Sequence, residues 1–267
     1  PSPKLNLKNF GKVAVMFGGS SAERDVSLNS GKAVLQGLLN MGIDAHAFDP
    51  AEQPLTQLMA EKFERVVIML HGRGGEDGSL QGALQQLNLP YSGSGVLGSA
   101  LCMDKIRSKQ VWQSLGLPTA NYIIADKRSF DARSCGAIMS KLDNEVMVKP
   151  AQEGSSIGMA RVNSALQLET AIQDAFKYDD QVLIEQFVDG TEYTVSILSG
   201  KALPSISMST PRIFYDYTAK YQSDSTVYRC PSGLSNELEV MLGDLAIKAY
   251  QALDGSGWGR IDFMQDK

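Results

Sequence analysis

The stretch of this sequence best suited to chemistry is HGRGGEDG at residues 71–78, which holds four glycines, two carboxylates and a histidine. It directly follows the apolar run 66–70, which predicts a fully buried strand. Glycine allows positive φ angles and lets the backbone approach a ligand closely. In open α/β sheets, ligands bind beyond the carboxyl ends of the strands. The octapeptide is therefore a candidate ligand-binding loop, and a plain glycine-rich surface turn is the alternative.

A second candidate loop joins Lys149 to the small residues GSSIG at 154–158. Successive backbone N–H groups in such a loop can converge on an anion, and a nearby lysine neutralises phosphate charge. The pattern differs from the GxxxxGK[ST] sequence of the common P-loop. Lys105 and Lys220 are further cations that could contact phosphate. The alternatives are a simple hairpin loop and lysines exposed to solvent.

The second half of the chain carries residues suited to nucleotide and metal chemistry. Arg260 and Asp262 lie two residues apart in the alternating run 257–264, so they share one face of a predicted strand. A guanidinium stabilises a developing oxyanion, and a carboxylate binds Mg²⁺ through hard oxygen atoms. Backbone groups at residues 185–188 could bind an adenine edge, and Glu192 could accept hydrogen bonds from ribose. An Arg260–Asp262 salt bridge and ordinary linker acids are the alternatives.

In the first hundred residues, the elements that must position these groups alternate between strand and helix. The predicted strands cover residues 12–17, 45–48 and 66–70. A helix with one apolar face ends at Gly42. Its apolar positions are Val34, Leu35, Leu38 and Met41. Strand–helix–strand order predicts parallel pairing and a doubly wound sheet.

The rest of the chain predicts two smaller α+β units. Helices are expected at 109–115, 165–176 and 236–253, and strands at 121–125, 145–149, 181–185, 193–198, 203–208 and 259–264, with a long polar loop at 210–231. A chain of 267 residues exceeds one typical domain. We therefore expect domains at 1–103, 104–188 and 189–267.

Composition disfavours several other classes of protein. The net charge is −5 with acids and bases interspersed, so neither a nucleic-acid nor a membrane partner is expected. Apolar runs are far shorter than a membrane span, and the first residues lack the apolar core of a signal peptide. The cysteines, Cys102, Cys135 and Cys230, are odd in number and widely spaced, which predicts reduced, buried thiols in a cytoplasmic protein. Two histidines exclude a multi-histidine metal centre.

Seven segments, taken in order, resemble the D-alanine–D-alanine ligase family of the ATP-grasp superfamily. HGRGGEDGSLQG resembles the first family signature throughout, and GWGRIDFM resembles the first half of the second. The others are FGGSSAERDVSL, MDKIRSK, VKPAQEGSSIG, EQFVDGTEYTV and FYDYTAKY. The resemblance covers essentially the whole chain. It implies an ATP-grasp fold, in which an N-terminal doubly wound parallel sheet precedes two α+β domains that sandwich ATP, the last of them incomplete here.

The same resemblance implies ATP-dependent ligation of two D-alanines for peptidoglycan precursor synthesis. ATP would convert one carboxylate into an acyl phosphate, which an amine then attacks, with Mg²⁺ or Mn²⁺ as the metal ion. A cytoplasmic homodimer is also implied. The implied nucleotide-binding residues are Lys105, Lys149, Glu153, Gly154, Ser155, Ser156, Glu185, Val188, Glu192, Tyr215 and Lys220. Asp262 would be a metal ligand, and Arg260 would stabilise the tetrahedral intermediate.

The resemblance also assigns the substrate pocket. Glu23 would hold the ammonium group of the first D-alanine, and His71 would lie near its carboxylate. Ser155 and Tyr221 would link Glu23 to the phosphate loop and to the long loop, which would seal the site from water. We expect the long loop to be mobile without ligand and to order over the site when ligands bind. A capping box at residues 20–23 is the alternative role for Glu23.

The sequence departs from the family in one respect. Members continue into a strand whose Glu and Asn complete the Mg²⁺ sites, whereas this sequence ends at Lys267. We therefore expect the 267-residue chain to bind Mg²⁺-ATP weakly and to have little ligase activity. Two other functions stay open. One is a ligase that takes D-lactate as its second substrate, which Tyr221 disfavours, and the other is a nucleotide-binding module without turnover.

Overall fold

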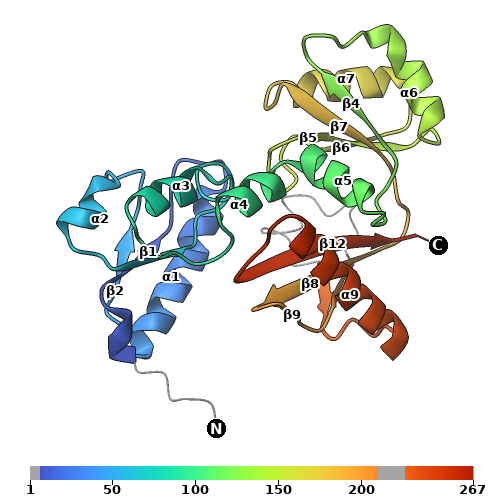
Figure 1. The fold of residues 1–267 in the computed structure, drawn as a ribbon. Coiled ribbons are helices and arrows are strands. Elements are labelled where there is room, and N and C mark those ends of the chain that lie inside the picture. The colour runs from blue at the N-terminus through green and yellow to red at the C-terminus, as the bar shows by residue number, and fades with distance from the viewer. Residues whose placement is uncertain (1–6, 210–225, 267) are drawn as a thin grey trace. The chain divides into compact units, whose positions relative to one another are not determined.

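The computed structural model describes residues 7–209 and 226–266 (Figure 1). The chain divides into two compact units, Pro1–Ala100 and Leu101–Lys267. Most of the predicted loop at 210–231 lies outside the described residues, so its closure over a ligand stays a prediction. Within the described residues, no helix combines the length and apolar character needed to cross a bilayer.

The first unit is built on a three-stranded parallel sheet with strand order β2-β1-β3. Its elements are η1 (Leu7–Phe10), β1 (Val13–Met16), α1 (Arg24–Asn40), β2 (Ala45–Phe48), α2 (Thr56–Ala60), β3 (Arg65–Ile68) and α3 (Ser79–Gln86), and α4 (Val96–Met103) leads into the second unit. Alternate residues of β1 point to opposite faces. Val13 and Val15 pack with α1, whereas Ala14 and Met16 pack with α2 and α3. Helices therefore cover both faces, and the predicted doubly wound sheet is confirmed.

The sequence prediction for this unit included neither α2, α3 nor α4, and two further details differ. The predicted strand 66–70 ends at Ile68, and Val66 is its only fully buried residue. The reason is that β3 lies at the sheet edge, with only an isolated bridge from Val66 to Tyr91 beyond it. Met41, predicted on the buried helix face, is 58% exposed because α1 ends one residue before it.

The second unit contains two sheets, and the first has strand order β4-β7-β5-β6 with every pair antiparallel. Its elements are α5 (Lys105–Ser114), β4 (Tyr122–Asp126), η2 (Ala132–Ser134), α6 (Cys135–Lys141), β5 (Val146–Pro150), β6 (Ala160–Val162), α7 (Ala165–Ala175) and β7 (Gln181–Gln186). α6 and α7 cover one face and enclose the largest buried cluster of the unit. On the other face, Ile106 of α5 packs against Leu183 of β7.

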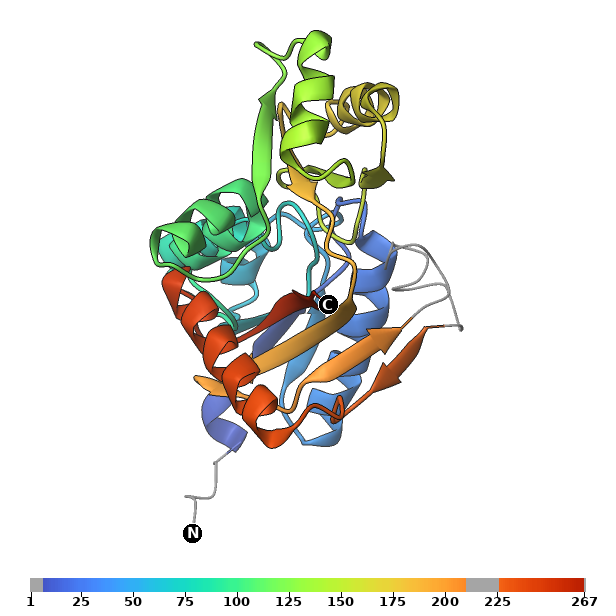
Figure 2. The same ribbon diagram turned by 90° about the vertical axis from the view of Figure 1, so that its right-hand side faces the viewer.

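The second sheet has strand order β11-β10-β8-β12, with the short β9 paired to β8. Its elements are β8 (Thr191–Leu198), β9 (Lys201–Ala202), β10 (Ile206–Ser209), β11 (Val227–Arg229), α9 (Asn236–Ala252) and β12 (Trp258–Gln265). α9 runs along one face of the sheet (Figure 2), where Ala246 and Tyr250 pack against Val195, Ile197 and Ile261. The residues that alternate with these apolar residues along each strand point to the opposite face of the sheet.

Several predictions for the second unit were wrong. Of the predicted strand 203–208, only residues 206–208 lie in a strand, β10, and the separate short strand β9 precedes the predicted range. β11 lies within the predicted loop 210–231, and β6 was missed. β6 and β11 have three residues each, too few to show a periodic pattern. The three cysteines are free, but only Cys135 is buried, and Cys102 and Cys230 are exposed. A single cysteine carries no periodicity that would place it inside or outside.

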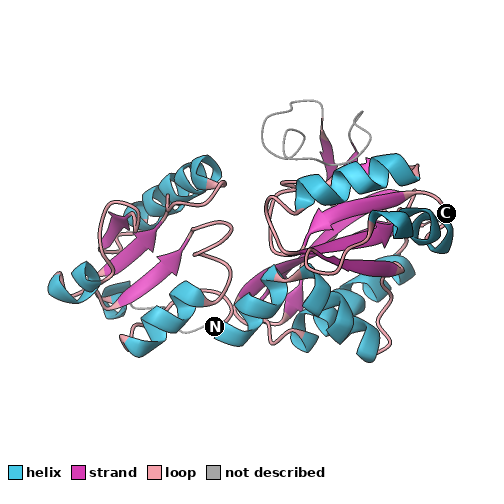
Figure 3. Cartoon of the chain, turned by 90° about the horizontal axis from the view of Figure 1, so that it is seen from above, coloured by secondary structure: helices cyan, strands magenta, loops and turns pink. Residues whose placement is uncertain are grey.

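In the first unit, the turns that follow β1 and β3 leave the sheet at the same edge, which is formed by the carboxyl ends of the parallel strands (Figure 3). This follows from the parallel pairing, because parallel strands end at a common edge. That edge is where ligands of open α/β sheets bind.

Candidate functional site

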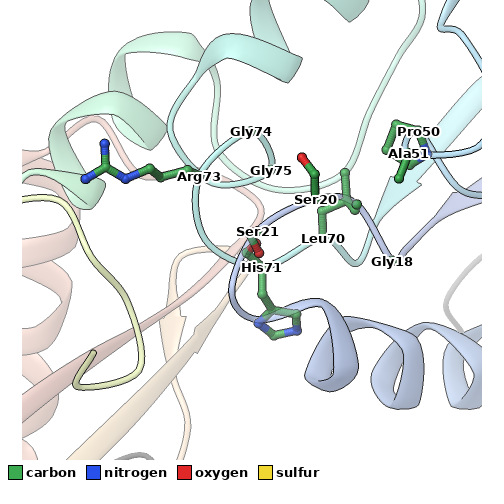
Figure 4. A pocket seen from close by; sticks show the side chains of 11 residues that line it. Gly18, Ser20, Ser21, Pro50, Ala51, Leu70, His71, Arg73, Gly74 and Gly75 are labelled. Carbon is green, nitrogen blue, oxygen red and sulfur yellow. The ribbon is translucent and has the colours of Figure 1, made fainter. Parts of the chain in front are cut away.

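A cavity of about 120 Å³ lies at this edge of the first unit (Figure 4). Residues 18–21 after β1, Pro50 and Ala51 after β2, and residues 70–75 after β3, except Gly72, line it. The loop predicted at 71–78 therefore forms one wall of the cavity. The volume is well below the roughly 300–1,000 Å³ typical of drug-sized ligand pockets, so the cavity suits a small ligand.

Two serines connect the turns that surround the cavity. Ser27 of α1 is fully buried, accepts a hydrogen bond from the Gly18 backbone N–H at 2.9 Å, and donates to the Met69 carbonyl at 2.7 Å. Ser21 Oγ donates to the His71 carbonyl at 2.7 Å. Both serines therefore fix the turn after β1 to the turn after β3. Sequence reasoning missed Ser27, although a small polar residue on an otherwise apolar helix face was an available signal.

Asp49, directly after β2, holds the turn at Gly18 and Gly19. It accepts a hydrogen bond from the Gly19 N–H at 2.9 Å and forms an ion pair with Arg24 at 2.8 Å. Gly18 has a φ of +96°, and a Cβ there would lie 2.3 Å from Asp49 Oδ2, so only glycine fits. Burial alone would raise the pKa of Asp49, but hydrogen bonds from Arg24 and from backbone N–H groups, together with the Arg24 charge, lower it.

Asp49→Asn should lower the free energy of unfolding by about 1–2 kcal/mol at pH 7, because a charged hydrogen bond is lost. Since folding lowers the pKa of Asp49, its contribution is complete above the unfolded pKa of about 3.9 and disappears as pH falls through the lower folded value. Urea denaturation of both proteins at pH 7, 4 and 3 measures this difference, which should shrink below about pH 4. A difference independent of pH would contradict the assigned charge effect.

Glu23 lies behind the cavity wall rather than in its lining. It precedes the first residue of α1, is 4% exposed, and makes no side-chain capping bond. A capping box would place Glu23 three residues into the helix, so the structure contradicts that alternative. Gly72 has a φ of +70°, and a Cβ on it would lie 2.8 Å from Glu23 Oε2. The Glu23 carboxylate therefore lies directly against the backbone of the glycine-rich loop.

His71 enters the same region from the other turn. Its ring points toward α1 (Figure 4), and Nε2 lies 3.1 Å from Ser30 Oγ. Arg73, in contrast, extends away from the other labelled side chains (Figure 4). The structure thus brings Glu23 and His71 to the two turns that Ser21 connects. Whether both contact a substrate stays a prediction.

In the second unit, the predicted phosphate-binding lysine and adenine-binding acid contact each other. Lys149 of β5 and Glu185 of β7 lie on the sheet face that α5 covers, and Lys149 Nζ donates to Glu185 Oε2. Lys109 of α5 donates to the other carboxylate oxygen, Oε1, at 2.6 Å. Burial by itself raises the pKa of Glu185, but the charges and hydrogen bonds of Lys149 and Lys109 lower it below its usual range. Sequence reasoning missed Lys109.

The predicted phosphate loop follows β5. Lys105, at the start of α5, donates from Nζ to the Glu153 carbonyl and from its backbone N–H to the Ala151 carbonyl at 2.9 Å. Ser155 and Ser156 have φ angles of +51° and +63°, which are costly for residues other than glycine. Strained backbone of this kind is concentrated at ligand-binding loops. The structure therefore brings Lys105 to the loop that begins at Glu153 and Gly154.

The polar face of the second sheet carries the other predicted residues. Asp262 is paired in register with Thr194, and Arg260 with Ser196. Asp262 Oδ1 accepts a hydrogen bond from Thr194 Oγ1 at 2.7 Å and forms an ion pair with Arg260 Nε at 3.1 Å. The salt bridge considered as an alternative is therefore present, but both side chains remain about half exposed. Thr194, which is buried, was missed by sequence reasoning.

The remaining predicted residues fall into two groups. Glu192 lies on the same face of β8 as Thr194, and Val188 is half-buried between β7 and β8. Tyr215, Lys220 and Tyr221 lie outside the described residues. Among the described residues, no group of three or more His, Cys, Asp or Glu side chains could hold a metal ion by itself. Asp262 nonetheless suits Mg²⁺, which proteins often bind through one or two carboxylates together with substrate phosphates.

Comparison with known proteins agrees with this arrangement. A family model described as "D-ala D-ala ligase C-terminus" matches residues 111–267. A D-alanine–D-alanine ligase from Pseudoalteromonas atlantica is 71% identical over 262 residues, which are 98% of this chain and 82% of the relative. The corresponding enzyme from Idiomarina loihiensis is 57% identical over 98% of this chain and 85% of its own length.

Solved structures give the same result. The D-alanine–D-alanine ligase from Bacillus anthracis, crystallised in complex with ATP, superposes with a TM-score of 0.83 at 30% sequence identity. The match covers 96% of this chain and 82% of that one.

Proposed function

The chain belongs to the D-alanine–D-alanine ligase family, and from that premise we propose that it joins two D-alanines in an ATP-dependent reaction. The observation that carries the proposal is 71% identity to such a ligase over 98% of the chain. Its fold is the ATP-grasp fold of that family, as the sequence predicted and as the solved relatives support. The product would be a precursor for peptidoglycan synthesis.

The proposed nucleotide site lies in the second unit. Lys105 and Lys149 would contact the α- and β-phosphates, and the loop from Glu153 through Ser156 would close over them. The backbone near Glu185 and Val188 would bind adenine, and Glu192 would accept hydrogen bonds from ribose. The contact of Lys105 with the Glu153 carbonyl and the left-handed backbone at Ser155 and Ser156 support this placement.

Mg²⁺, or Mn²⁺ in its place, is the metal ion that we propose for the reaction. When bound, it would neutralise charge on the β- and γ-phosphates. Asp262 would be the metal ligand that the described residues supply. Its Oδ1 is held by Thr194 and Arg260, which fixes the orientation of the carboxylate.

The chemical steps follow from the family reaction. The carboxylate of the first D-alanine takes the γ-phosphoryl group of ATP, which gives an acyl phosphate and ADP. The amine of the second D-alanine attacks the acyl carbon, loses a proton and expels phosphate. Negative charge grows on the former acyl oxygen, where the Arg260 guanidinium would stabilise it. Glu23 would bind the first ammonium group, and His71 would lie near the first carboxylate.

Three further residues complete the proposal. Tyr215 and Lys220 would contact the nucleotide, and Tyr221 together with Ser155 would exclude water from the acyl phosphate. Tyr215, Lys220 and Tyr221 are outside the described residues, so their support is the sequence resemblance alone.

We also propose a cytoplasmic location, with which three free cysteines are consistent, and a homodimer.

One assay separates the three candidate functions. The protein, ATP and Mg²⁺ are incubated with D-alanine, with D-alanine plus D-lactate, or with L-alanine, and phosphate and products are measured by a coupled assay and mass spectrometry. We expect one phosphate for each D-alanyl-D-alanine and none with L-alanine. A predominant D-alanyl-D-lactate ester would favour the D-lactate alternative. ATP binding without any phosphate release would favour the module without turnover.

A further inference from the structure

Lys109 is a buried lysine to which the proposed function gives no role. Its side chain is 5% exposed, on the face of α5 that packs against the first sheet of the second unit. Lysine is almost never fully buried unless its charge is paired. Contacts of the Lys109 ammonium group must therefore offset the free-energy cost of removing it from water.

The partners of Lys109 explain how the charge is accommodated. Nζ lies 2.6 Å from Glu185 Oε1 and 2.6 Å from Thr119 Oγ1, and it lies 5.0 Å from the centre of the Tyr122 ring. Glu185 uses its second oxygen, Oε2, to accept from Lys149. One carboxylate thus lies between two lysines, each bound to a different oxygen.

The charges in this cluster do not cancel. Lys109, Glu185 and Lys149 together carry two positive charges and one negative charge. Lys109 is enclosed, whereas the Lys149 side chain is 23% exposed, so the surplus charge is accessible only at Lys149. If Lys109 were absent, Glu185 would form a neutral pair with Lys149 alone. That pair would attract an anion far less, because the two charges would largely cancel at the distance of a ligand.

We propose that Lys109 is a positioning residue that neutralises Glu185, so that the charge of Lys149 remains available to the phosphates of the nucleotide. The inference rests on the proposed function, which places phosphate at Lys149. It differs from a purely structural role in one measurable respect. A structural lysine would affect every ligand of the site, whereas a counter-charge affects phosphate binding and leaves the nucleoside part unchanged.

The test compares ADP with adenosine, which lacks phosphate, as competitors of a fluorescent ATP analogue. Lys109→Met should weaken ADP binding by about tenfold, the order expected for loss of one partly screened charge interaction, and should change adenosine binding by less than about twofold. The double variant K109M/E185Q has the same net charge as the original cluster. It should therefore return the ratio of adenosine to ADP dissociation constants to near the original value.

Two further variants keep the test informative. Glu185→Gln alone should leave that ratio at or above the original value, and it decides the question if K109M does not fold. Lys177→Met is the matched control, because Lys177 is 72% exposed in the same unit and contacts Asp174 instead. It should change neither constant.

The outcomes separate the inference from the proposed function. Equal weakening of ADP and adenosine in K109M, or a double variant no better than K109M, would overturn the inference, and so would a ratio lowered by E185Q. Failure of the unmodified protein to bind ADP would instead contradict the proposed nucleotide site.

Discussion

Replacing Arg260 with lysine should lower kcat by about 10²- to 10³-fold and change the KM for ATP by less than about threefold. The reason is that the oxyanion develops only as the amine attacks, so the guanidinium contributes to the transition state and little to nucleotide binding. Lysine keeps the charge but lacks the planar fork of donors. It would also lose the Nε donor that now contacts Asp262 Oδ1 at 3.1 Å.

Steady-state kinetics of phosphate release at saturating D-alanine measure this effect. Arg133→Lys is a matched control, because Arg133 in η2 forms the same kind of ion pair, with Asp131 two residues away. Its side chain is 91% exposed and lies outside the proposed site. The control should keep full activity. An Arg260→Lys protein with unchanged kcat, or with a raised KM for ATP as its only defect, would show that Arg260 does not stabilise the oxyanion.

Replacing Glu23 with glutamine should raise the apparent KM for the first D-alanine by roughly ten- to more than a hundredfold. A charged hydrogen bond lost in a shielded site costs about 1.5–3 kcal/mol, which corresponds to that range. Glutamine keeps the size of the side chain and most of its hydrogen-bonding capacity. The KM for ATP should change little, because the proposed nucleotide residues lie in the second unit.

The control is Glu61→Gln, because Glu61 is partly exposed at the end of α2 and contacts Lys12 rather than the cavity turns. Thermal denaturation of both variants separates binding from folding. A Glu23→Gln protein that is less stable but has the same dependence on D-alanine would assign Glu23 a structural role. The substrate assignment would then fail.

Much of the fold was predictable because its signals are local. The apolar run at β1 and the glycine after α1 each lie within one short segment. Parallel pairing follows from the order of strands and helices, since a crossover is needed between parallel strands. The glycine-rich loop 71–78 could be placed at the ligand-binding edge for the same reason. Short strands such as β6 gave too little pattern to be found.

The contacts within the site could not be read from the sequence. Lys109 and Glu185 are 76 residues apart, and Thr194 and Asp262 are 68 apart. Asp49 reaches Gly19 from a different turn. None of these partners has a fixed spacing, because each pair depends on strand register and on which helix covers which sheet face.

The sequence by itself therefore determined most of the longer helices and strands, the ligand-binding edge of the first unit and the family resemblance. Only the tertiary structure decided that Glu185 lies between two lysines, that Thr194 orients Asp262, and that Glu23 makes no side-chain capping bond. The physical reason is the distance along the chain over which each kind of interaction acts. Backbone preferences and hydrophobic periodicity act over a few neighbouring residues, whereas a buried charge is stabilised by whichever partner the folded chain brings within hydrogen-bonding distance.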